Sequence, residues 1–416
     1  MKILFFTGSV GLGHVWRDLA IAREIRRLGG AEISWLAAPP ADRVIKDAGE
    51  ILLPESALLA NDSEIAERRA GPARLSLIRY AAAAGAGWSG NVDLVDRLVA
   101  ERGFDLLVGD ETYEVSLAYK KQPGRRKCPF VMIYDFIGID AMSWSPVERI
   151  GAYVWNRSWA DGYKQPPPPG WLGLFIGEEA DIPDRRFGFL LPRRRDWARA
   201  RCRFVGYVLP FDPANCSDRS SLRARLGYDA SPLVIGAIGG TAIGKELLCL
   251  CGRAFPFARR AINDLRMVLV CGPRLDPKDV AAPSGVEVRG YVPSLYEHLA
   301  ACDLAVVQGG GTVTLELTAL RRPFLYFPIE GHSEQEVAVF ERLKRHGAGV
   351  RLRASTVTPA GLAQAITEHL GRPVSYPPIP TDGARTAAHA IADFAGWAPR
   401  PSLSATGEYG NVHPLK

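Results

Sequence analysis

The hydrophobic positions of this chain form short, nearly continuous apolar runs that alternate with longer segments of helical periodicity. Such runs are typical of strands in a parallel sheet that is covered on both faces. In the segment 17–28, Ile21, Ile25 and Leu28 lie at i, i+4 and i+7, which predicts a helix with one apolar face. We expect strands at 2–7, 33–37, 105–108 and 129–134 in the first half, and at 232–238, 267–271, 286–291, 304–307 and 324–327 in the second.

Both halves open with the same order of elements, which is an apolar strand, a glycine loop and a helix. This repetition predicts an α/β fold with two doubly wound domains, whose ligands bind at the carboxyl ends of the strands. A chain of 416 residues is also too long for one ordinary core. We predict a first domain at 1–212, a linker at 213–230, a second domain at 231–380, and a segment 381–416 with a helix at 385–397 that returns to the first domain before a frayed tail.

The composition is that of a globular protein, with 47% hydrophobic and 23% charged residues. No window approaches the roughly 18 consecutive apolar residues of a membrane span, and the apolar run at the N-terminus is too short for a signal peptide. The seven cysteines are scattered without a CxxC pair, which favours free thiols in a reducing compartment. These features predict a cytoplasmic protein.

The formal net charge of +6 comes from 51 basic and 45 acidic residues, and much of the excess lies in the segment 185–203. One interpretation of this segment is a solvated connection between elements. The other is contact with an anionic acceptor or peripheral contact with a membrane surface. No nucleic-acid-binding module accompanies the basic segment, so we expect no nucleic-acid partner.

The segment 303–335 carries the most specific pattern. It predicts a buried strand, a glycine turn, a helix with Glu316 in its early turns, a second buried strand and a polar loop. Glycines let a diphosphate approach backbone N–H groups and a helix N-terminus. A carboxylate further along the helix suits the two hydroxyls of a ribose, although Glu316 could instead only favour the helix dipole. The pattern indicates a nucleotide diphosphate that carries another group, most simply a sugar.

The two other glycine loops exclude common alternatives. The loop from Gly239 to Lys245 lacks only the final Ser or Thr of a P-loop, where Glu246 stands and could not supply the hydroxyl ligand for magnesium. We therefore expect a phosphate-binding turn without metal. The spacing of Gly8, Gly11 and Gly13 differs from the dinucleotide-binding fingerprint, which argues against a nicotinamide or flavin cofactor. No paired acidic motif for a metal accompanies these loops, so the sequence predicts neither metal nor cofactor.

His14 follows the glycine loop of the first half directly. A histidine at the start of a helix faces the ligand edge of its domain, whereas a structural histidine would more often lie on the packed face. We therefore expect a catalytic role for His14.

Taken together, these motifs resemble the GT-B superfamily of nucleotide-sugar glycosyltransferases. The resemblance is strongest over 232–370 and is supported by the N-terminal segment from Gly11 to Arg17. It is greatest to the branch of the lipid-linked N-acetylglucosaminyltransferase of peptidoglycan synthesis and of the antibiotic glycosyltransferases. It implies two Rossmann-like domains that face each other across a cleft. It also implies metal-independent, inverting transfer of a sugar from a nucleotide diphosphate sugar, expected to be UDP-linked. The implied acceptor is a small molecule or is lipid-linked, as in cell-wall or natural-product glycosylation.

The resemblance also implies roles for individual residues. His14 is similar to the general base of many members, and Asp110 to the carboxylate that orients it, with Glu111 and Asp135 as rivals of Asp110. Gln308 stands where many members have histidine, and Glu334 stands where they have aspartate. The implied donor site comprises diphosphate contacts at Gly240, Thr241, Gln308, Gly309, Gly310, Gly311 and Thr314, a base-binding turn at Tyr291 and Val292, a ribose clamp at Glu316, and contacts to the donor sugar at Glu334 and Gln335.

Two other functions stay compatible with these residues. A nucleotide-sugar epimerase uses the same fold and donor without an acceptor, and a non-catalytic partner protein would bind the nucleotide without turnover. Asp110 could also only cap a helix, and Glu334 and Gln335 could form a solvated helix start.

Overall fold

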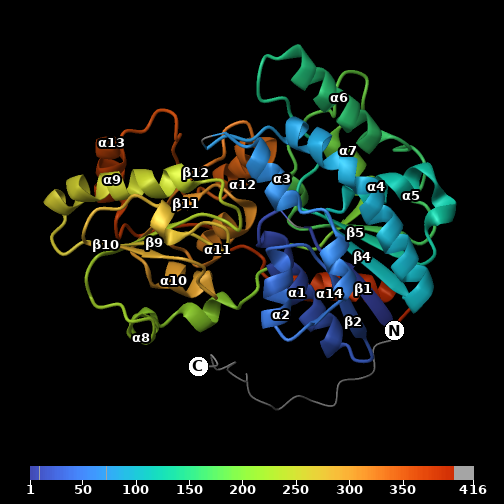
Figure 1. Cartoon of the computed structure of the whole chain (residues 1–416), viewed down its shortest axis with the longest axis horizontal. Helices are drawn as coiled ribbons and strands as arrows, with labels where there is room; N and C mark the ends of the chain where they lie inside the picture. The colour runs from blue at the N-terminus through green and yellow to red at the C-terminus, as the bar shows by residue number, and fades with distance from the viewer. Residues whose placement is uncertain (9, 72, 398–416) are drawn as a thin grey trace.

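The computed structural model of the chain describes residues 1–8, 10–71 and 73–397. It has two lobes, each built around one parallel sheet with helices on both faces (Figure 1). The sheet of the N-terminal lobe has the strand order β3-β2-β1-β4-β5-β6-β7. Its strands are β1 (Lys2–Phe6), β2 (Glu32–Leu36), β3 (Ile51–Leu52), β4 (Leu106–Asp110), β5 (Phe130–Tyr134), β6 (Trp171–Phe175) and β7 (Cys202–Phe204).

The sheet of the C-terminal lobe repeats this topology with the order β10-β9-β8-β11-β12-β13. Every pairing between neighbouring strands is parallel, as expected where helices connect successive strands. The strands are β8 (Leu233–Ala237), β9 (Arg266–Val270), β10 (Val286–Arg289), β11 (Leu304–Gln308), β12 (Phe324–Phe327) and β13 (Val350–Arg351).

Helices cover both faces of each sheet (Figure 1). In the N-terminal lobe they are α1 (Gly13–Arg27), α2 (Ala41–Asp47), α3 (Asp62–Arg69), α4 (Leu77–Arg102), α5 (Tyr113–Lys121), α6 (Pro146–Ala160) and α7 (Arg194–Arg201). In the C-terminal lobe they are α8 (Arg219–Arg225), α9 (Lys245–Ala261), α10 (Leu295–Ala301), α11 (Gly311–Ala319), α12 (Phe340–Arg345) and α13 (Pro359–His369). Among the described residues, no helix is both long and apolar enough to cross a membrane.

The last described helix, α14 (Gly383–Phe394), lies beside α1 in the N-terminal lobe (Figure 1). Ala387 and Ile391 of α14 pack in the same buried layer as Ile21 and Ile25 of α1. This layer covers one face of the sheet, and a second apolar layer with many aromatic side chains covers the other. The chain therefore crosses back from the C-terminal lobe to complete the first core.

The predicted fold class is confirmed, and each strand expected from the apolar runs is present. The apolar pattern did not predict β3 and β13, which have two residues each, or β6 and β7, which extend the sheet beyond β5. A two-residue strand is too short to show a period. The proposed domain boundaries stay a prediction, and the expected frayed tail after residue 397 lies outside the described residues.

Candidate active site

The carboxyl ends of the two sheets face each other. Each sheet reverses its strand order beside its first strand, because β1 lies between β2 and β4 and β8 lies between β9 and β11. In open α/β sheets, ligands bind at the carboxyl ends of the strands at this point of reversal. The loops at both points line one cleft of about 310 Å³. The position of the cleft therefore follows from the strand order of both sheets.

The glycine loops of the two lobes touch across this cleft. A Cβ atom on Gly13 would lie 2.3 Å from Oγ1 of Thr312, and one on Gly240 would lie 2.6 Å from the backbone nitrogen of Leu12. Real Cβ atoms do not approach other atoms so closely, so both positions need glycine in this closed arrangement. Gly11, which has φ of +84°, lies at the same contact.

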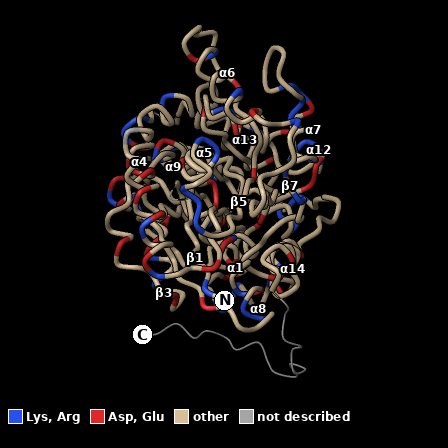
Figure 2. The backbone as a smooth tube through the Cα atoms, turned by 90° about the vertical axis from the view of Figure 1, so that its right-hand side faces the viewer, with Lys and Arg blue, Asp and Glu red and all other residues tan. Residues whose placement is uncertain are grey.

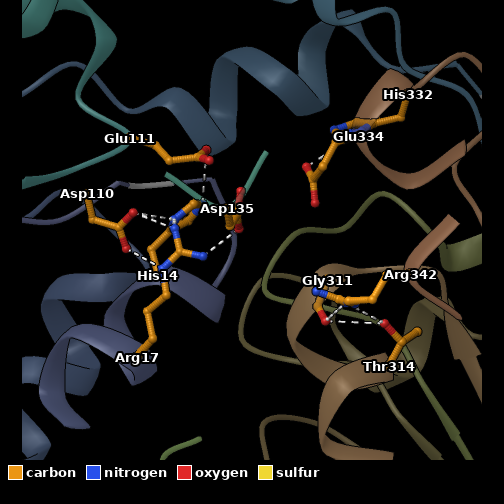
Figure 3. A network of polar contacts seen from close by, with 10 residues as sticks. All are labelled: His14, Arg17, Asp110, Glu111, Asp135, Gly311, Thr314, His332, Glu334 and Arg342. Carbon is orange, nitrogen blue, oxygen red and sulfur yellow. Dashed lines mark hydrogen bonds and ion pairs between the residues drawn. The ribbon is translucent and has the colours of Figure 1, made fainter. Parts of the chain in front are cut away.

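His14 lies in the first turn of α1 and lines the cleft. Asp110 is the last residue of β4, which lies beside β1. Phe6 at the end of β1 pairs with Gly109 of β4. The adjacent strand ends therefore bring the two predicted catalytic residues together. Nδ1 of His14 lies 3.4 Å from Oδ1 of Asp110, whose side chain is fully buried and lies behind the histidine, away from the cleft lining (Figure 3).

Arg17 lies between the predicted catalytic residues. It is one helical turn after His14 on the same face of α1, and 5% of its surface is exposed. Its Nε donates to Oδ2 of Asp110 at 2.6 Å, and its Nη2 donates to Oδ1 of the same carboxylate. The same Nη2 lies 2.7 Å from Nδ1 of His14. The guanidinium therefore touches His14 more closely than Asp110 does.

Glu111 and Asp135, the two rivals of Asp110, belong to the same cluster (Figure 3). Asp135 follows β5 and accepts from Nη1 of Arg17 at 2.5 Å. Glu111 follows β4 directly, lines the cleft, and places Oε2 at 3.9 Å from Nε2 of His14. Its φ of +51° is unusual for a residue with a side chain and is found at functional sites.

Most of the predicted donor-site residues line the opposite wall of the cleft. They are Gly240, Thr241, Tyr291, Val292, Gln308, Gly310, Gly311, Glu316, Glu334 and Gln335. The two diphosphate loops are tied together, because Nε2 of Gln308 donates to the carbonyl of Ile243 at 2.5 Å. The guanidinium carbon of Arg43 in α2 lies over the Tyr291 ring, 5.6 Å from the centroid of the ring. This contact links the predicted base-binding turn to the other lobe.

Two of the predicted donor-site residues do not line the cleft. Gly309 packs behind the turn, where a Cβ atom would lie 2.8 Å from Cα of Pro328. Thr314 is fully buried, and its hydroxyl donates to the carbonyl of Gly310 at 2.7 Å within its own helix. Both positions support the loop instead of facing a ligand.

The comparisons with known proteins agree with this geometry. The glycosyltransferase family 28 C-terminal domain matches residues 238–389. In the solved structure of CalG4, the calicheamicin glycosyltransferase, 95% of each chain is covered with a TM-score of 0.53 and 18% identity. The chain therefore has the GT-B fold, and its segment 238–389 is similar to the glycosyltransferase family 28 C-terminal domain.

The chain is similar to several proteins that are named as glycosyltransferases. An uncharacterised glycosyltransferase of Methanosarcina acetivorans is 25% identical over 88% of this chain and 89% of its own length. Two other matches cover less than half of the relative. They are a Methanopyrus kandleri glycosyltransferase (26% identical over 40% of this chain and 46% of its length) and the UDP-N-acetylglucosamine--N-acetylmuramyl-(pentapeptide) pyrophosphoryl-undecaprenol N-acetylglucosamine transferase of Carboxydothermus hydrogenoformans (30% identical over 33% of this chain and 38% of its length).

Burial and neighbouring charges divide the carboxyl groups on the N-terminal wall of the cleft into two kinds. Burial and the adjacent Asp135 carboxylate raise the pKa of Glu111 well above its usual value. Burial acts in the same direction on Asp135 and Asp110, but the charge of Arg17 outweighs it and lowers the pKa of both. Asp110 and Asp135 are therefore held ionised, whereas the Glu111 carboxyl group holds its proton more strongly than an ordinary glutamate does.

On the opposite wall of the cleft, burial raises the pKa of Glu316 to about 8, and burial with the nearby Asp135 raises that of Glu334 to about 8. Neither carboxyl group has a charged partner as close as Arg17 is to Asp110. Within the described part of the chain, no three His, Cys, Asp or Glu side chains are gathered so that they could hold a metal ion.

Sequence reasoning missed the role of Arg17 and the apolar wall of the cleft. Aromatic side chains from four segments of the N-terminal lobe form this wall, and the rings of Trp88 and Trp155 lie 5.6 Å apart. The other members are Tyr80, Tyr113 and Phe136. The helical spacing of His14 and Arg17 was a usable signal for Arg17. The aromatic wall had none, because its residues come from segments far apart in the sequence.

Proposed function

We propose that this GT-B protein is a metal-independent, inverting glycosyltransferase that moves a sugar from a nucleotide diphosphate sugar, UDP-linked, to a hydroxyl group of a small-molecule or lipid-linked acceptor. The observation that carries the proposal is the cleft between the two switch points, with glycine loops on one wall and the His14 cluster on the other. Support for UDP comes from the name of the Carboxydothermus relative, which includes UDP-N-acetylglucosamine.

The geometry fits a single displacement at the anomeric carbon, which inverts its configuration. The N-terminus of α11 at Gly311 and the loop at Gly240 and Thr241 can receive the negative charge of the leaving diphosphate through backbone N–H groups. The acceptor hydroxyl would lie at His14, with Asp110 behind it as a positioning residue. Aromatic walls of this kind suit an acceptor with an apolar body.

Transfer from UDP-N-acetylglucosamine labelled in the sugar tests this function. We expect label to appear in an acceptor from a panel of hydroxylated small molecules and lipid extracts, with EDTA present and with inverted anomeric configuration by NMR. Loss of transfer in EDTA that manganese restores would contradict metal independence. Interconversion of the donor sugar without acceptor would indicate the epimerase, and UDP binding without any turnover would indicate the non-catalytic partner.

Glu316 is proposed to hold the ribose hydroxyls. Its carboxyl group is 7% exposed, lines the cleft and has no charged partner that lowers its pKa. A deoxyribose would leave one buried oxygen without a partner, which costs about 1–3 kcal/mol or roughly tenfold in affinity. Calorimetric titration should therefore show weaker binding of 2′-deoxy-UDP than of UDP, and Glu316→Gln should reduce this difference. Equal affinities of the parent protein for the two nucleotides would remove the ribose role.

An exposed apolar surface on the N-terminal lobe supports the membrane contact considered from the sequence. Trp144, Val147, Phe189 and Leu190 are 79–89% exposed, although large apolar side chains are usually buried. With Ile150 and Val154 they form a surface, here called the α6 patch, on α6, on Trp144 before it and on the segment with Phe189 and Leu190; α6 projects at the edge of the lobe (Figure 1). Helix α6 and the segment that contains Phe189 are adjacent, because the hydroxyl of Tyr153 in α6 donates to the carbonyl of Phe189 at 3.4 Å.

The basic segment 185–203 contributes fewer free charges than its sequence suggests. Arg194 is buried and holds the Asp140 carboxylate through two hydrogen bonds of 2.9 Å, and Arg199 pairs with Glu179. Elsewhere basic and acidic residues are interspersed along the chain (Figure 2). We therefore propose that peripheral membrane contact uses the α6 patch, with the exposed Arg149 and Arg157 of α6 toward anionic headgroups.

Co-sedimentation with vesicles that contain phosphatidylglycerol tests this contact. Val147→Asp combined with Ile150→Asp should lower the bound fraction by about tenfold or more, because each apolar side chain contributes about 1.5–3 kcal/mol when fully buried. Phe257→Asp, at an exposed apolar residue of α9, is the matched control and should bind as the parent does. A parent protein that stays in the supernatant would refute membrane contact through the α6 patch.

A further inference from the structure

The contact between Arg17 and His14 determines where the neutral imidazole carries its proton. A guanidinium group has only donors, so in the 2.7 Å contact Nδ1 of His14 accepts from Nη2 of Arg17, and the Asp110 carboxylate, 3.4 Å from Nδ1, is the longer of the two contacts. A neutral imidazole has one N–H and one acceptor nitrogen, which leaves the proton on Nε2. A proton on Nδ1 would oppose the N–H of Arg17 with a second donor. His14 therefore presents a donor at Nε2, where a general base would need a lone pair.

A carboxyl group stands next to this donor. Oε2 of Glu111 lies 3.9 Å from Nε2 of His14, which is too far for a direct hydrogen bond. One oxygen atom placed between them can lie within hydrogen-bonding distance of both. Both side chains line the cleft, and the unusual φ of +51° at Glu111 is part of the turn that brings its carboxyl group there. A hydroxyl group in this position would accept from His14 and donate to Glu111.

We propose that Glu111 takes the proton from the acceptor hydroxyl and that His14 is the hydrogen-bond donor that holds this hydroxyl in place. The inference rests on the proposed glycosyl transfer and states which group takes the proton of the acceptor hydroxyl. As the acceptor oxygen bonds to the anomeric carbon, its O–H bond breaks and the proton passes to the Glu111 carboxylate. The bond between the anomeric carbon and the diphosphate oxygen breaks with its electron pair on the nucleoside diphosphate.

The charges around Glu111 suit this role. Asp135, held ionised by Arg17, adjoins Glu111 and raises its pKa together with burial, which makes the Glu111 carboxylate a stronger base than an ordinary one. The titratable and charged groups that act on Glu111 or are acted on by it are His14, Arg17, Tyr80, Asp110, Tyr113, Tyr134 and Asp135. Because the ionised form is the base, turnover should rise with pH through the pKa of Glu111.

The tautomer of His14 can be measured without any turnover. Long-range proton–nitrogen NMR of the full chain labelled with 15N-histidine should show the proton of the neutral His14 imidazole on Nε2. The His14 signals are assigned by their loss in His14→Gln. In Arg17→Gln this tautomer should no longer dominate, because the amide that replaces the guanidinium can accept as well as donate. A parent protein with the proton on Nδ1 would overturn the proposal.

Kinetics separate the donor role from the base role. The probe is UDP release from UDP-N-acetylglucosamine, with water or an acceptor from the transfer assay. Glu111→Gln should lose about 10²–10⁴-fold in turnover and flatten the acid limb of the pH profile. His14→Gln carries an amide N–H near the place of Nε2, so it should keep at least about tenfold more activity than His14→Ala. His14→Gln as inactive as His14→Ala, with an active Glu111→Gln, would return the base role to His14.

Failure of this inference differs from failure of the proposed function. If UDP does not bind and no sugar is transferred by the parent protein, the proposed function fails, whereas the NMR result still decides the tautomer. Thermal unfolding of each variant, compared with the parent, verifies that the substituted lobe folds, and UDP titration verifies that the donor site on the other lobe is intact.

Discussion

Replacement of His14 by alanine is expected to lower turnover by about two orders of magnitude or more, and to leave the affinity for UDP unchanged. In the proposed reaction His14 contacts the acceptor hydroxyl, either as a hydrogen-bond donor or as a general base. Loss of a donor or of a base at this position lowers turnover by at least about a hundredfold. In the proposed function the donor nucleotide binds to the C-terminal lobe, on the wall of the cleft opposite His14. Steady-state rates and calorimetric titration with UDP measure the two effects separately.

The matched control is His389→Ala, which removes an exposed histidine from α14 in the same lobe and should leave both quantities unchanged. Asp110→Asn should act in the same direction as His14→Ala but less strongly, because Asp110 does not line the cleft and acts through Arg17. Near-normal turnover of His14→Ala would remove the imidazole from the reaction. A large loss of UDP affinity would instead show that His14 contacts the donor.

The architecture could be predicted from the sequence because its information is local. Each long strand is an apolar run that is buried on both faces of its sheet, as in β4 and β5, where every residue is buried. The repetition of strand, glycine loop and helix then implied two doubly wound sheets. Strands such as β13, with two half-buried residues, are defined by pairing with a neighbour and leave no periodic pattern in the sequence.

The site was predictable to the extent that its residues belong to local motifs. His14 and Glu316 follow glycine turns at helix starts, and both line the cleft. Thr314 belongs to the same motif, but its hydroxyl is satisfied by the carbonyl of Gly310, a local competition that the motif alone does not reveal. A motif therefore identifies the loop that faces the ligand more reliably than each side chain within it.

The cluster around Arg17 could not be predicted from the sequence in the same way. Asp110 and Asp135 are far from Arg17 along the chain and meet it only because β4 lies beside β1 and β5 lies beside β4, so that their carboxyl ends are close together. Glu111 was weighed only as a rival of Asp110, whereas the structure places both carboxyl groups in one cluster with different ionisation. Strand order, which no single segment encodes, determines this arrangement.

The largest expected effect on stability is that of Arg17→Met. The substitution keeps an apolar stem of similar length but leaves the Asp110 carboxylate, whose side chain is fully buried, without its cation. Breaking a buried ion pair by removing one partner costs about 3–5 kcal/mol. Denaturant unfolding near neutral pH should show a loss of this size. Arg23→Met, at an exposed arginine of α1, is the control and should change the free energy of unfolding by less than about 0.5 kcal/mol.

The pH dependence of Arg17→Met should have the opposite sign to that of the parent. In the parent, Arg17 holds the pKa of Asp110 and Asp135 below their unfolded values despite burial, so their contribution is present above the unfolded pKa and is lost as the pH falls through the folded pKa. Without Arg17, burial raises the pKa of Asp110, so the variant loses stability as the pH rises. Its deficit should therefore be smaller at pH 5 than at pH 8, and Asp110→Asn added to Arg17→Met should recover part of it. A deficit that is independent of pH would mean that Arg17 stabilises the lobe by packing and not by its charge.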